Sequence, residues 1–190
     1  MYKFSYKFLS TIIKNRTSNH LPHWISLDQY GFVKQRSILG AINVFLEVTD
    51  DLNTKVHGSD MVIKLEMDKS YERLEWSFII KVFIGMGLSY WAIDLIFRCF
   101  ISSWLVVRFM GRNFGFFKAV CGLRQGDPLS LILFIIAQNV LSYLINKGIM
   151  RGSIFPYHCK SIPCGISHLM FADDTIIFMN AGLSSICEIN

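Results

Sequence analysis

Apolar residues recur at helical spacing in several parts of the chain, and these stretches predict helices. Ser37 stands directly before one apolar stripe and could cap it. Asp127 and Pro128 are favoured at a helix cap and first turn, and Gly148 is favoured just past a helix end. The predicted helices span residues 6–15, a stretch that begins at residue 38, and residues 74–86, 90–101 and 128–147.

Elsewhere the apolar period changes to two, which predicts strands. From Met61 onward, Val62, Lys64, Glu66 and Asp68 fall on one face of a strand, and Ile63, Leu65 and Met67 fall on the other. The remaining predicted strands span residues 104–110, 114–120, 166–171 and 175–179, with turns at 111–113 and 172–174. Because helices and hairpins are mixed, the pattern favours an α+β fold.

Composition narrows the function classes. The chain has 190 residues, of which 52% are hydrophobic and 17% charged, which excludes intrinsic disorder and predicts one folded domain. Nineteen Lys and Arg face 14 Asp and Glu, and this net charge of +5 is compatible with a nucleic-acid partner. The five cysteines lack a paired metal-ligand spacing, so they indicate reduced thiols in an intracellular protein.

A membrane span is a weaker alternative. The best uncharged stretch, residues 128–146, contains several polar side chains, and residues 88–110 are interrupted by Asp94, Arg98 and Arg108. The N-terminus has no acidic residue before Asp28 and weakly resembles an organelle transit peptide, but we favour an ordinary basic helix. We therefore expect no membrane partner and a location in the nucleus or cytoplasm, with an organelle as the weaker option.

Carboxylates provide the first candidate chemistry. Asp173 and Asp174 lie between two apolar strands, and Glu66 and Asp68 lie at the end of another. Such pairs are common in turns, but at the edge of a core they repel unless cations join them. Mg²⁺ is the natural partner for hard oxygen ligands, and a third carboxylate would complete a two-metal site suited to phosphoryl transfer.

The second candidate is the loop before the long predicted helix. Gly122 and Gly126 flank Arg124 and Gln125, directly before the helix cap. This could simply be a glycine loop with a cap. Alternatively, free backbone N–H groups, the positive end of the helix and Arg124 would favour phosphate or a nucleic-acid backbone.

Several ordered segments now resemble one family. Residues 122–130 read Gly-Leu-Arg-Gln-Gly-Asp-Pro-Leu-Ser, and residues 171–174 read Phe-Ala-Asp-Asp. Both resemble core motifs of reverse transcriptases, most closely those of LINE-type retrotransposons of plants. Residues 29–33 with Arg36 and Ser37, and residues 64–76, resemble further motifs of the same family in the same order.

The resemblance implies a right-hand polymerase fold. It places fingers at about residues 1–57 and 78–121, and palm at about residues 58–77 and 122–190. The palm is expected to hold an antiparallel sheet with packed helices. A thumb and an endonuclease would belong to regions of a larger polyprotein outside this chain, so we expect a truncated copy.

The resemblance also assigns roles by position. The catalytic acids would be Glu66, Asp173 and Asp174, and together with the backbone carbonyl of Met67 they would hold two Mg²⁺ ions. Nucleotide and template would meet Arg36, Tyr71, Arg124, Gln125 and Gly126. The implied partners are an RNA template, a DNA primer and deoxynucleoside triphosphates.

The chain also departs from the family pattern. Glu66 stands where the family has Asp, which moves the carboxylate by about 1.5 Å. A misplacement of about 1 Å can lower a rate on the order of 100-fold. Cys121 replaces an Arg and Leu131 replaces a Pro, as in a decaying copy. We expect an RNA-directed DNA polymerase fragment that is weak or inactive, or else a non-catalytic nucleic-acid-binding remnant.

Overall fold

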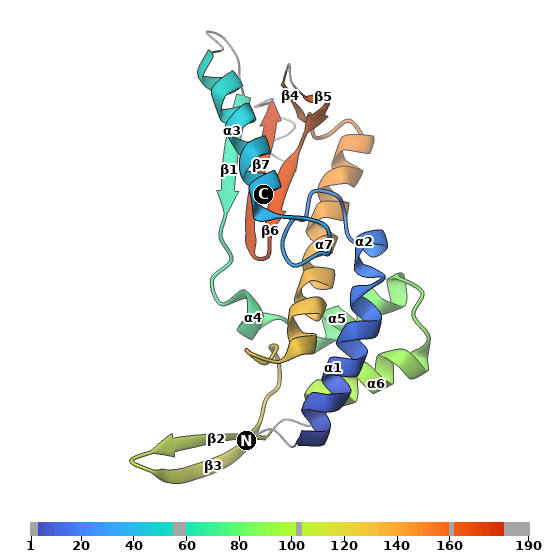
Figure 1. The fold of residues 1–190 in the computed structure, drawn as a ribbon, viewed down its shortest axis with the longest axis vertical. Helices are drawn as coiled ribbons and strands as arrows, with labels where there is room; N and C mark the ends of the chain where they lie inside the picture. Colours follow the sequence, from blue (N-terminus) through green and yellow to red (C-terminus); the bar gives the residue numbers. More distant parts are fainter. Residues whose placement is uncertain (1–3, 55–59, 102–103, 160–161, 181–190) are drawn as a thin grey trace. The chain divides into compact units, whose positions relative to one another are not determined.

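The computed structural model describes residues 4–54, 60–101, 104–159 and 162–180 (Figure 1). The chain divides into two compact units. The first comprises residues 1–17 and 69–137, and the second comprises residues 18–68 and 138–190. This division is not the finger and palm division expected from the resemblance, which stays a prediction. Each unit is described by itself below.

The second unit is built on a three-stranded antiparallel sheet in the order β1-β7-β6. These strands are β1 (Asp60–Leu65), β6 (His168–Phe171) and β7 (Asp174–Asn180). Side chains alternate between the two faces of β7, as the period of two predicts. Phe178 packs with Val48 of α3 (Ile38–Thr54), whereas Ile177 packs with Ile145 of α7 (Pro128–Met150). The sheet is therefore covered by a helix on each face (Figure 1).

Shorter elements complete this unit. They are α2 (Leu21–Trp24), β4 (Tyr157–Cys159) and β5 (Ile162–Ile166). The strands β4 and β5 pair with each other and pack Tyr157 and Ile166 into the cluster around Phe178. Gln29 also bridges to Met170 in parallel orientation, so the segment around Gln29 extends the sheet beyond β6.

The first unit contains four helices in its described residues, besides the start of α7. They are α1 (Phe4–Ser18), α4 (Ser70–Arg73), α5 (Trp76–Gly85) and α6 (Tyr90–Ile101). A two-stranded ribbon follows, formed by β2 (Trp104–Phe109) and β3 (Arg112–Lys118). Every residue of this ribbon is exposed, whereas Trp76, Ile79 and Phe83 of α5 are buried. The core of this unit therefore lies between helices.

The mixture of helices and antiparallel strands confirms the predicted α+β class. The helix over residues 90–101 has the predicted bounds, and α3 begins where Ser37 accepts a hydrogen bond from the Gly40 amide (3.2 Å). Asp127 also caps α7 as predicted, since its Oδ1 accepts from the Leu129 amide (3.1 Å). The alternation of β1 is confirmed too, because Lys64 is exposed where Ile63 and Leu65 are half-buried.

Two predicted helices differ in extent. The helix predicted over residues 74–86 is present as α5 but is shorter, because Leu74 adopts extended backbone and separates α4 from α5. The buried face of α5 is accordingly displaced from the predicted one, and Phe78 is exposed. The long helix runs on through Gly148 to Met150. A Cβ at Gly148 would lie 2.6 Å from Ile154 Cδ1, so this glycine permits close packing instead of ending the helix.

The predicted strand ends were also shifted. β1 ends at Leu65, so Glu66 and Asp68 follow the strand instead of lying within it. The turn between β2 and β3 is at Met110 and Gly111, which both have positive φ, and not at residues 111–113. Asp174 belongs to β7, which leaves Ala172 and Asp173 as the turn. The strand β4 was not predicted at all.

Among the described residues, one helix is long and apolar enough to cross a membrane, namely α7. However, 61% of its most apolar window is buried inside the structure. The core helix of a globular protein passes the same test, so this finding is weak support for a span.

Candidate functional site

The sheet of the second unit brings the acidic residues to one edge. Asp173 lies in the turn between β6 and β7, and Asp174 is the first residue of β7, paired with Phe171. Leu65, the last residue of β1, pairs with Thr175 of β7. Glu66 follows Leu65 directly, so all three predicted catalytic acids lie where β1 ends and β7 begins. The three side chains are exposed.

Lys64 lies between two of these acids. Its Nζ atom is 3.7 Å from Glu66 Oε2 and 3.8 Å from Asp174 Oδ1. The side chains of these three residues are 60%, 80% and 59% exposed, respectively. Ion pairs with such exposure contribute little to stability. The ammonium nevertheless supplies a positive charge where the two carboxylates would otherwise repel each other.

Metal binding at these acids is not shown by their geometry. The described residues contain no group of three or more His, Cys, Asp or Glu side chains that could hold a metal ion. The Lys64 ammonium also stands where a cation shared by Glu66 and Asp174 would be expected. The Met67 side chain accepts a hydrogen bond from Gln138 Nε2 at its sulfur (3.8 Å). The role of the Met67 carbonyl as a metal ligand stays a prediction.

Arg36 is engaged by the loop before α3. Its guanidinium donates hydrogen bonds to the carbonyl oxygens of Gln29 (2.7 Å), Ile25 (3.1 Å), Pro22 (3.4 Å) and Ser26. Burial lowers the pKa of Arg36, and nearby Asp28 opposes this effect. In this geometry Arg36 holds a loop together. Its expected contact with a triphosphate stays a prediction.

The remaining candidate residues belong to the first unit. The Tyr71 ring stacks on Phe134, with centroids 4.1 Å apart and an interplanar angle of 14°. The Arg124 guanidinium lies 4.7 Å from the centroid of the Tyr6 ring. Gln125 and Gly126 are exposed in the loop before α7, as a ligand-binding loop requires. Their assigned roles toward nucleotide and template stay predictions.

Gly122 fixes the path of this loop. Its amide donates to the Leu74 carbonyl (2.8 Å), and its carbonyl accepts from Trp76 Nε1 (2.8 Å). Its φ is +82°, and a Cβ there would lie 2.6 Å from the Glu72 carbonyl oxygen. Only glycine fits both demands.

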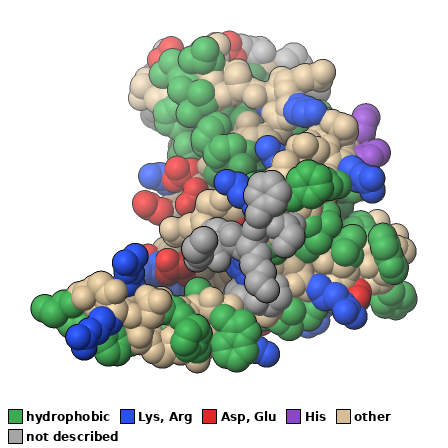
Figure 2. All heavy atoms as spheres, turned by 60° about the horizontal axis from the view of Figure 1, so that its bottom comes forward, with side chains coloured by type: hydrophobic (Ala, Val, Ile, Leu, Met, Phe, Trp, Pro, Cys, Tyr) green, Lys and Arg blue, Asp and Glu red, His purple; other side chains and the backbone are tan. Residues whose placement is uncertain are grey.

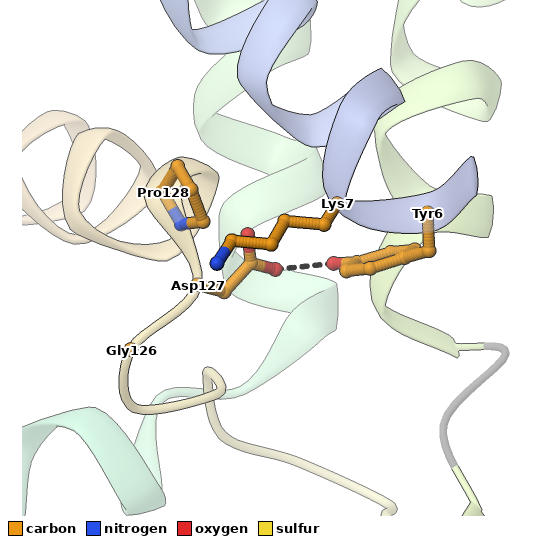
Figure 3. A pocket seen from close by; sticks show the side chains of 5 residues that line it. All are labelled: Tyr6, Lys7, Gly126, Asp127 and Pro128. Atoms are coloured by element: carbon orange, nitrogen blue, oxygen red, sulfur yellow. Dashed lines mark hydrogen bonds between the residues drawn. The ribbon is translucent and has the colours of Figure 1, made fainter. Parts of the chain in front are cut away.

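Asp127 does more than cap α7, which the sequence alone did not indicate. Its carboxylate accepts hydrogen bonds from the Tyr6 hydroxyl and the Ser10 hydroxyl, both on α1. Tyr6 and Lys7 line a cavity of about 90 Å³ with Asp127 and the residues on either side of it (Figure 3). Burial and the hydrogen bond to Asp127 raise the pKa of Tyr6 far above its ordinary value. The negative charge at this helix start is thus supplied by the chain itself.

His168 is a second polar group that the sequence did not single out. It is fully buried on β6, where its Nε2 lies 2.6 Å from Ser142 Oγ and its Nδ1 lies 2.8 Å from Ser167 Oγ. Asp28 Oδ2 is 3.5 Å from Nε2 as well. In a Ser-His-Asp triad the serine and the acid contact different ring nitrogens. Ser167 and Asp28 do contact different nitrogens here, but His168, Ser142 and Ser167 are all buried, so no substrate reaches either serine and the cluster is structural.

Comparison with known proteins identifies the family to which this chain belongs. Residues 1–188 match the family model described as reverse transcriptase (RNA-dependent DNA polymerase). The chain belongs to the reverse transcriptase family. This confirms the resemblance that its motifs carried. The assignment of Glu66, Asp173 and Asp174 as its catalytic acids stays a prediction.

One relative and two solved structures are also similar to this chain. A 54-residue segment is 46% identical to an uncharacterised mitochondrial protein of Arabidopsis thaliana, covering 28% of this chain and 44% of that protein. Apo telomerase from Candida tropicalis, truncated from its C-terminal domain, matches with a TM-score of 0.63 at 16% identity, over 95% of this chain and 35% of that one. Telomerase from Candida tropicalis with a fragment of telomeric RNA matches with a TM-score of 0.63 at 15% identity, over 95% and 29% of the two chains. This reverse transcriptase chain thus spans less than half of each of these proteins and shares the fold of part of the telomerases.

Proposed function

We propose that this reverse transcriptase chain is the fingers and palm part of a LINE-type RNA-directed DNA polymerase. Its reaction would be the extension of a DNA primer on an RNA template by nucleotidyl transfer. The observation that carries this proposal is the edge of the sheet where Glu66, Asp173 and Asp174 gather. The family match supports the same chemistry.

We expect this activity to be weak, because two features oppose it. Glu66 carries one more methylene than the Asp of the family, and a carboxylate displaced by about 1 Å can cost on the order of 100-fold in rate. Reverse transcriptases generally depend on divalent metal ions, but Lys64 lies between Glu66 and Asp174. A divalent cation would have to displace that ammonium group. For this reason Mg²⁺ remains part of the proposal only as the family's usual cofactor.

Primer extension on an RNA template tests the proposal. The purified chain is given a labelled DNA primer, an RNA template, deoxynucleoside triphosphates and Mg²⁺, beside Asp173→Asn and Glu66→Asp variants. We expect feeble extension in the wild type, none in Asp173→Asn, and an increase of up to about 100-fold in Glu66→Asp. Extension that survives Asp173→Asn would refute the assigned site. Strong wild-type extension that Asp173→Asn abolishes would refute the expected weakness.

A second candidate function is nucleic-acid binding without synthesis, and the exposed ribbon of the first unit favours it. Trp104, Phe109 and Phe116 are 60%, 61% and 74% exposed. Arg108, Arg112 and Lys118 lie in the same two strands, which contain no acidic residue. Figure 2 shows hydrophobic and basic side chains gathered over this ribbon. Aromatic faces beside cations suit stacked bases and a phosphate backbone.

Salt dependence tests this candidate. We expect the affinity for a labelled single-stranded RNA to fall as the salt concentration rises, because bound cations release counterions from the phosphates. Arg108→Gln with Arg112→Gln should reduce the slope of log affinity against log salt by about 1.4, at ~0.7 per lost phosphate contact on a single strand. Lys81→Gln, on α5 of the same unit, is the control that keeps the ribbon intact. Affinity that does not depend on salt would remove this candidate.

Partners and location complete the proposal. An RNA template, a DNA primer and deoxynucleoside triphosphates are proposed from the family, and one matched telomerase structure holds a fragment of telomeric RNA. We propose a location inside the cell, in the nucleus or cytoplasm. The mitochondrial description of the plant relative keeps an organelle as the alternative.

A further inference from the structure

The acidic turn of the second unit is held from outside the hairpin that forms it. Ala172, the residue before Asp173, has a φ of +56°, a left-handed backbone conformation that is unfavourable for a residue with a Cβ. A two-residue turn with this strain requires support from neighbouring groups to persist. The support comes from the segment around Gln29, more than a hundred residues away in sequence.

The Gln29 side chain bonds both backbone groups of Ala172. Its Oε1 accepts from the Ala172 amide (3.1 Å), and its Nε2 donates to the Ala172 carbonyl (3.3 Å). The same Oε1 accepts from the Gly31 amide (2.8 Å), which fixes the side-chain conformation. Gln29 is fully buried, and a buried amide with unmet hydrogen bonds is costly, so this geometry is strongly favoured.

The backbone around Gln29 is fitted to the same place. The Tyr30 amide donates to the Met170 carbonyl, and the Met170 amide donates to the Asp28 carbonyl, both at 2.8 Å. A Cβ at Gly31 would overlap the Ala172 amide nitrogen, so a glycine is needed for this close approach. The segment therefore lies against β6 as a short additional strand that reaches the turn.

Arg36 secures the segment from its other side. Its guanidinium binds the Gln29 carbonyl (2.7 Å) together with carbonyls earlier in the same loop. A continuous chain of contacts thus runs from Arg36 through Gln29 to Ala172, and from there along the backbone to Asp173. Each of these residues belongs to the second unit.

We infer that Gln29 is a positioning residue for Asp173 and Asp174. Its amide acts as a brace that holds the strained Ala172 backbone and so fixes the direction in which the two carboxylates leave the turn. This inference rests on the proposed function for its catalytic meaning. The brace itself is a property of the fold and is testable without activity.

Amide hydrogen exchange measured by NMR on the full chain tests the brace. In Gln29→Met, we expect protection of the Ala172 amide to fall roughly tenfold or more, because its acceptor is lost. Protection of the Phe178 amide, which donates to the Ser167 carbonyl in the same unit, should change less than about threefold. In Gln29→Glu measured at acid pH, one oxygen of the protonated side chain can accept from the Ala172 amide and the O–H can donate to the Ala172 carbonyl, so we expect most of the Ala172 protection to return.

The control is Tyr157→Phe, which removes a hydrogen bond to Asp51 (2.6 Å) in the same unit and leaves both Gln29 bonds to Ala172 in place. It should change the protection of the Ala172 amide less than about threefold. If Gln29→Met leaves the Ala172 protection unchanged, or if Gln29→Glu loses as much protection as Gln29→Met, the brace is refuted. The Glu variant also keeps the test open where the Met variant fails to fold.

Primer extension then separates the brace from the proposed function. If the chain extends primers, Gln29→Met should lower kcat and leave KM nearly unchanged. The loss of kcat in Gln29→Met should also exceed the loss in Tyr157→Phe. Equal losses in the two variants would refute the positioning role. If the wild-type chain extends no primer, the proposed activity is refuted. If Gln29→Met alone still loses Ala172 protection in that case, the brace is supported.

Discussion

Replacing Asp127 should destabilise the first unit strongly. Its side chain is 7% exposed and accepts three hydrogen bonds, from the Tyr6 hydroxyl, the Ser10 hydroxyl and the Leu129 amide. Hydrogen bonds to a charged group contribute about 1.5–3 kcal/mol each, and a lost helix cap costs about 1 kcal/mol. Since the three bonds share one carboxylate and are not additive, we expect Asp127→Ala to lower the free energy of unfolding by about 3–5 kcal/mol.

Denaturation in urea, followed by tryptophan fluorescence, measures this loss. Three of the four tryptophans, Trp76, Trp91 and Trp104, lie in the first unit and report mainly on it. Asp127→Asn keeps one carbonyl acceptor, so it should cost only about 1–2 kcal/mol. Asp94→Ala is the control, because the Asp94 side chain is 55% exposed and forms an ion pair with Arg98 on α6. It should change stability by less than about 0.5 kcal/mol.

A double-mutant cycle measures how much of this free energy comes from the hydrogen bond between Tyr6 and Asp127. Tyr6→Phe removes one donor to Asp127, and the coupling between Tyr6→Phe and Asp127→Ala should be about 1–3 kcal/mol. If Asp127→Ala costs under about 1 kcal/mol, or if the coupling is close to zero, then α1 is not held to α7 through this carboxylate. The reasoning from buried hydrogen bonds would then be wrong for this unit.

Three further outcomes follow from buried groups. Because the pKa of Tyr6 is raised in the folded chain, its contribution to stability is complete below about pH 10 and is lost above it; urea midpoints at pH 9 and 11 should show a fall that Tyr6→Phe reduces. Burial lowers the pKa of His168, so stability is present above about pH 6.5 and is lost as the pH falls below that value; His168→Asn should flatten the decline between pH 7.5 and 5.5. Gly122→Ala should cost at least about 2 kcal/mol because its Cβ would meet a carbonyl of α4, whereas Gly87→Ala, with φ +77° but open space, should cost about 1 kcal/mol in the same denaturation assay.

The sequence predicted those features of the fold that depend on neighbours along the chain. The bounds of α6, the Ser37 and Asp127 caps and the alternation of β1 all follow from local periodicity and capping chemistry. The break at Leu74 did not follow, because Leu74 continues an apolar spacing of four. What interrupts the helix there is a contact from far along the chain, the Gly122 amide on the Leu74 carbonyl.

The candidate site was also predicted only in part from the sequence. The ordered motifs located Glu66, Asp173 and Asp174, and the sheet register then placed them at one edge. The sequence did not indicate that Arg36 binds loop carbonyls or that Gln29 binds the Ala172 backbone. Both contacts depend on how the chain folds back on itself. No local sequence pattern around Arg36 or Gln29 predicts such a partner.

Lys64 and Glu66 are the two features expected to weaken metal binding at the acidic edge, and their expected effects differ in size. The pairs of Lys64 with Glu66 and Asp174 are long and exposed, and such pairs are worth about 0–1 kcal/mol. The displaced carboxylate of Glu66 corresponds to a loss on the order of 100-fold, or about 2.7 kcal/mol. The exposed Lys64 side chain is therefore the smaller obstacle to activity, and the additional methylene of Glu66 is the larger one. For this reason Glu66→Asp, and not a change at Lys64, should restore the most activity.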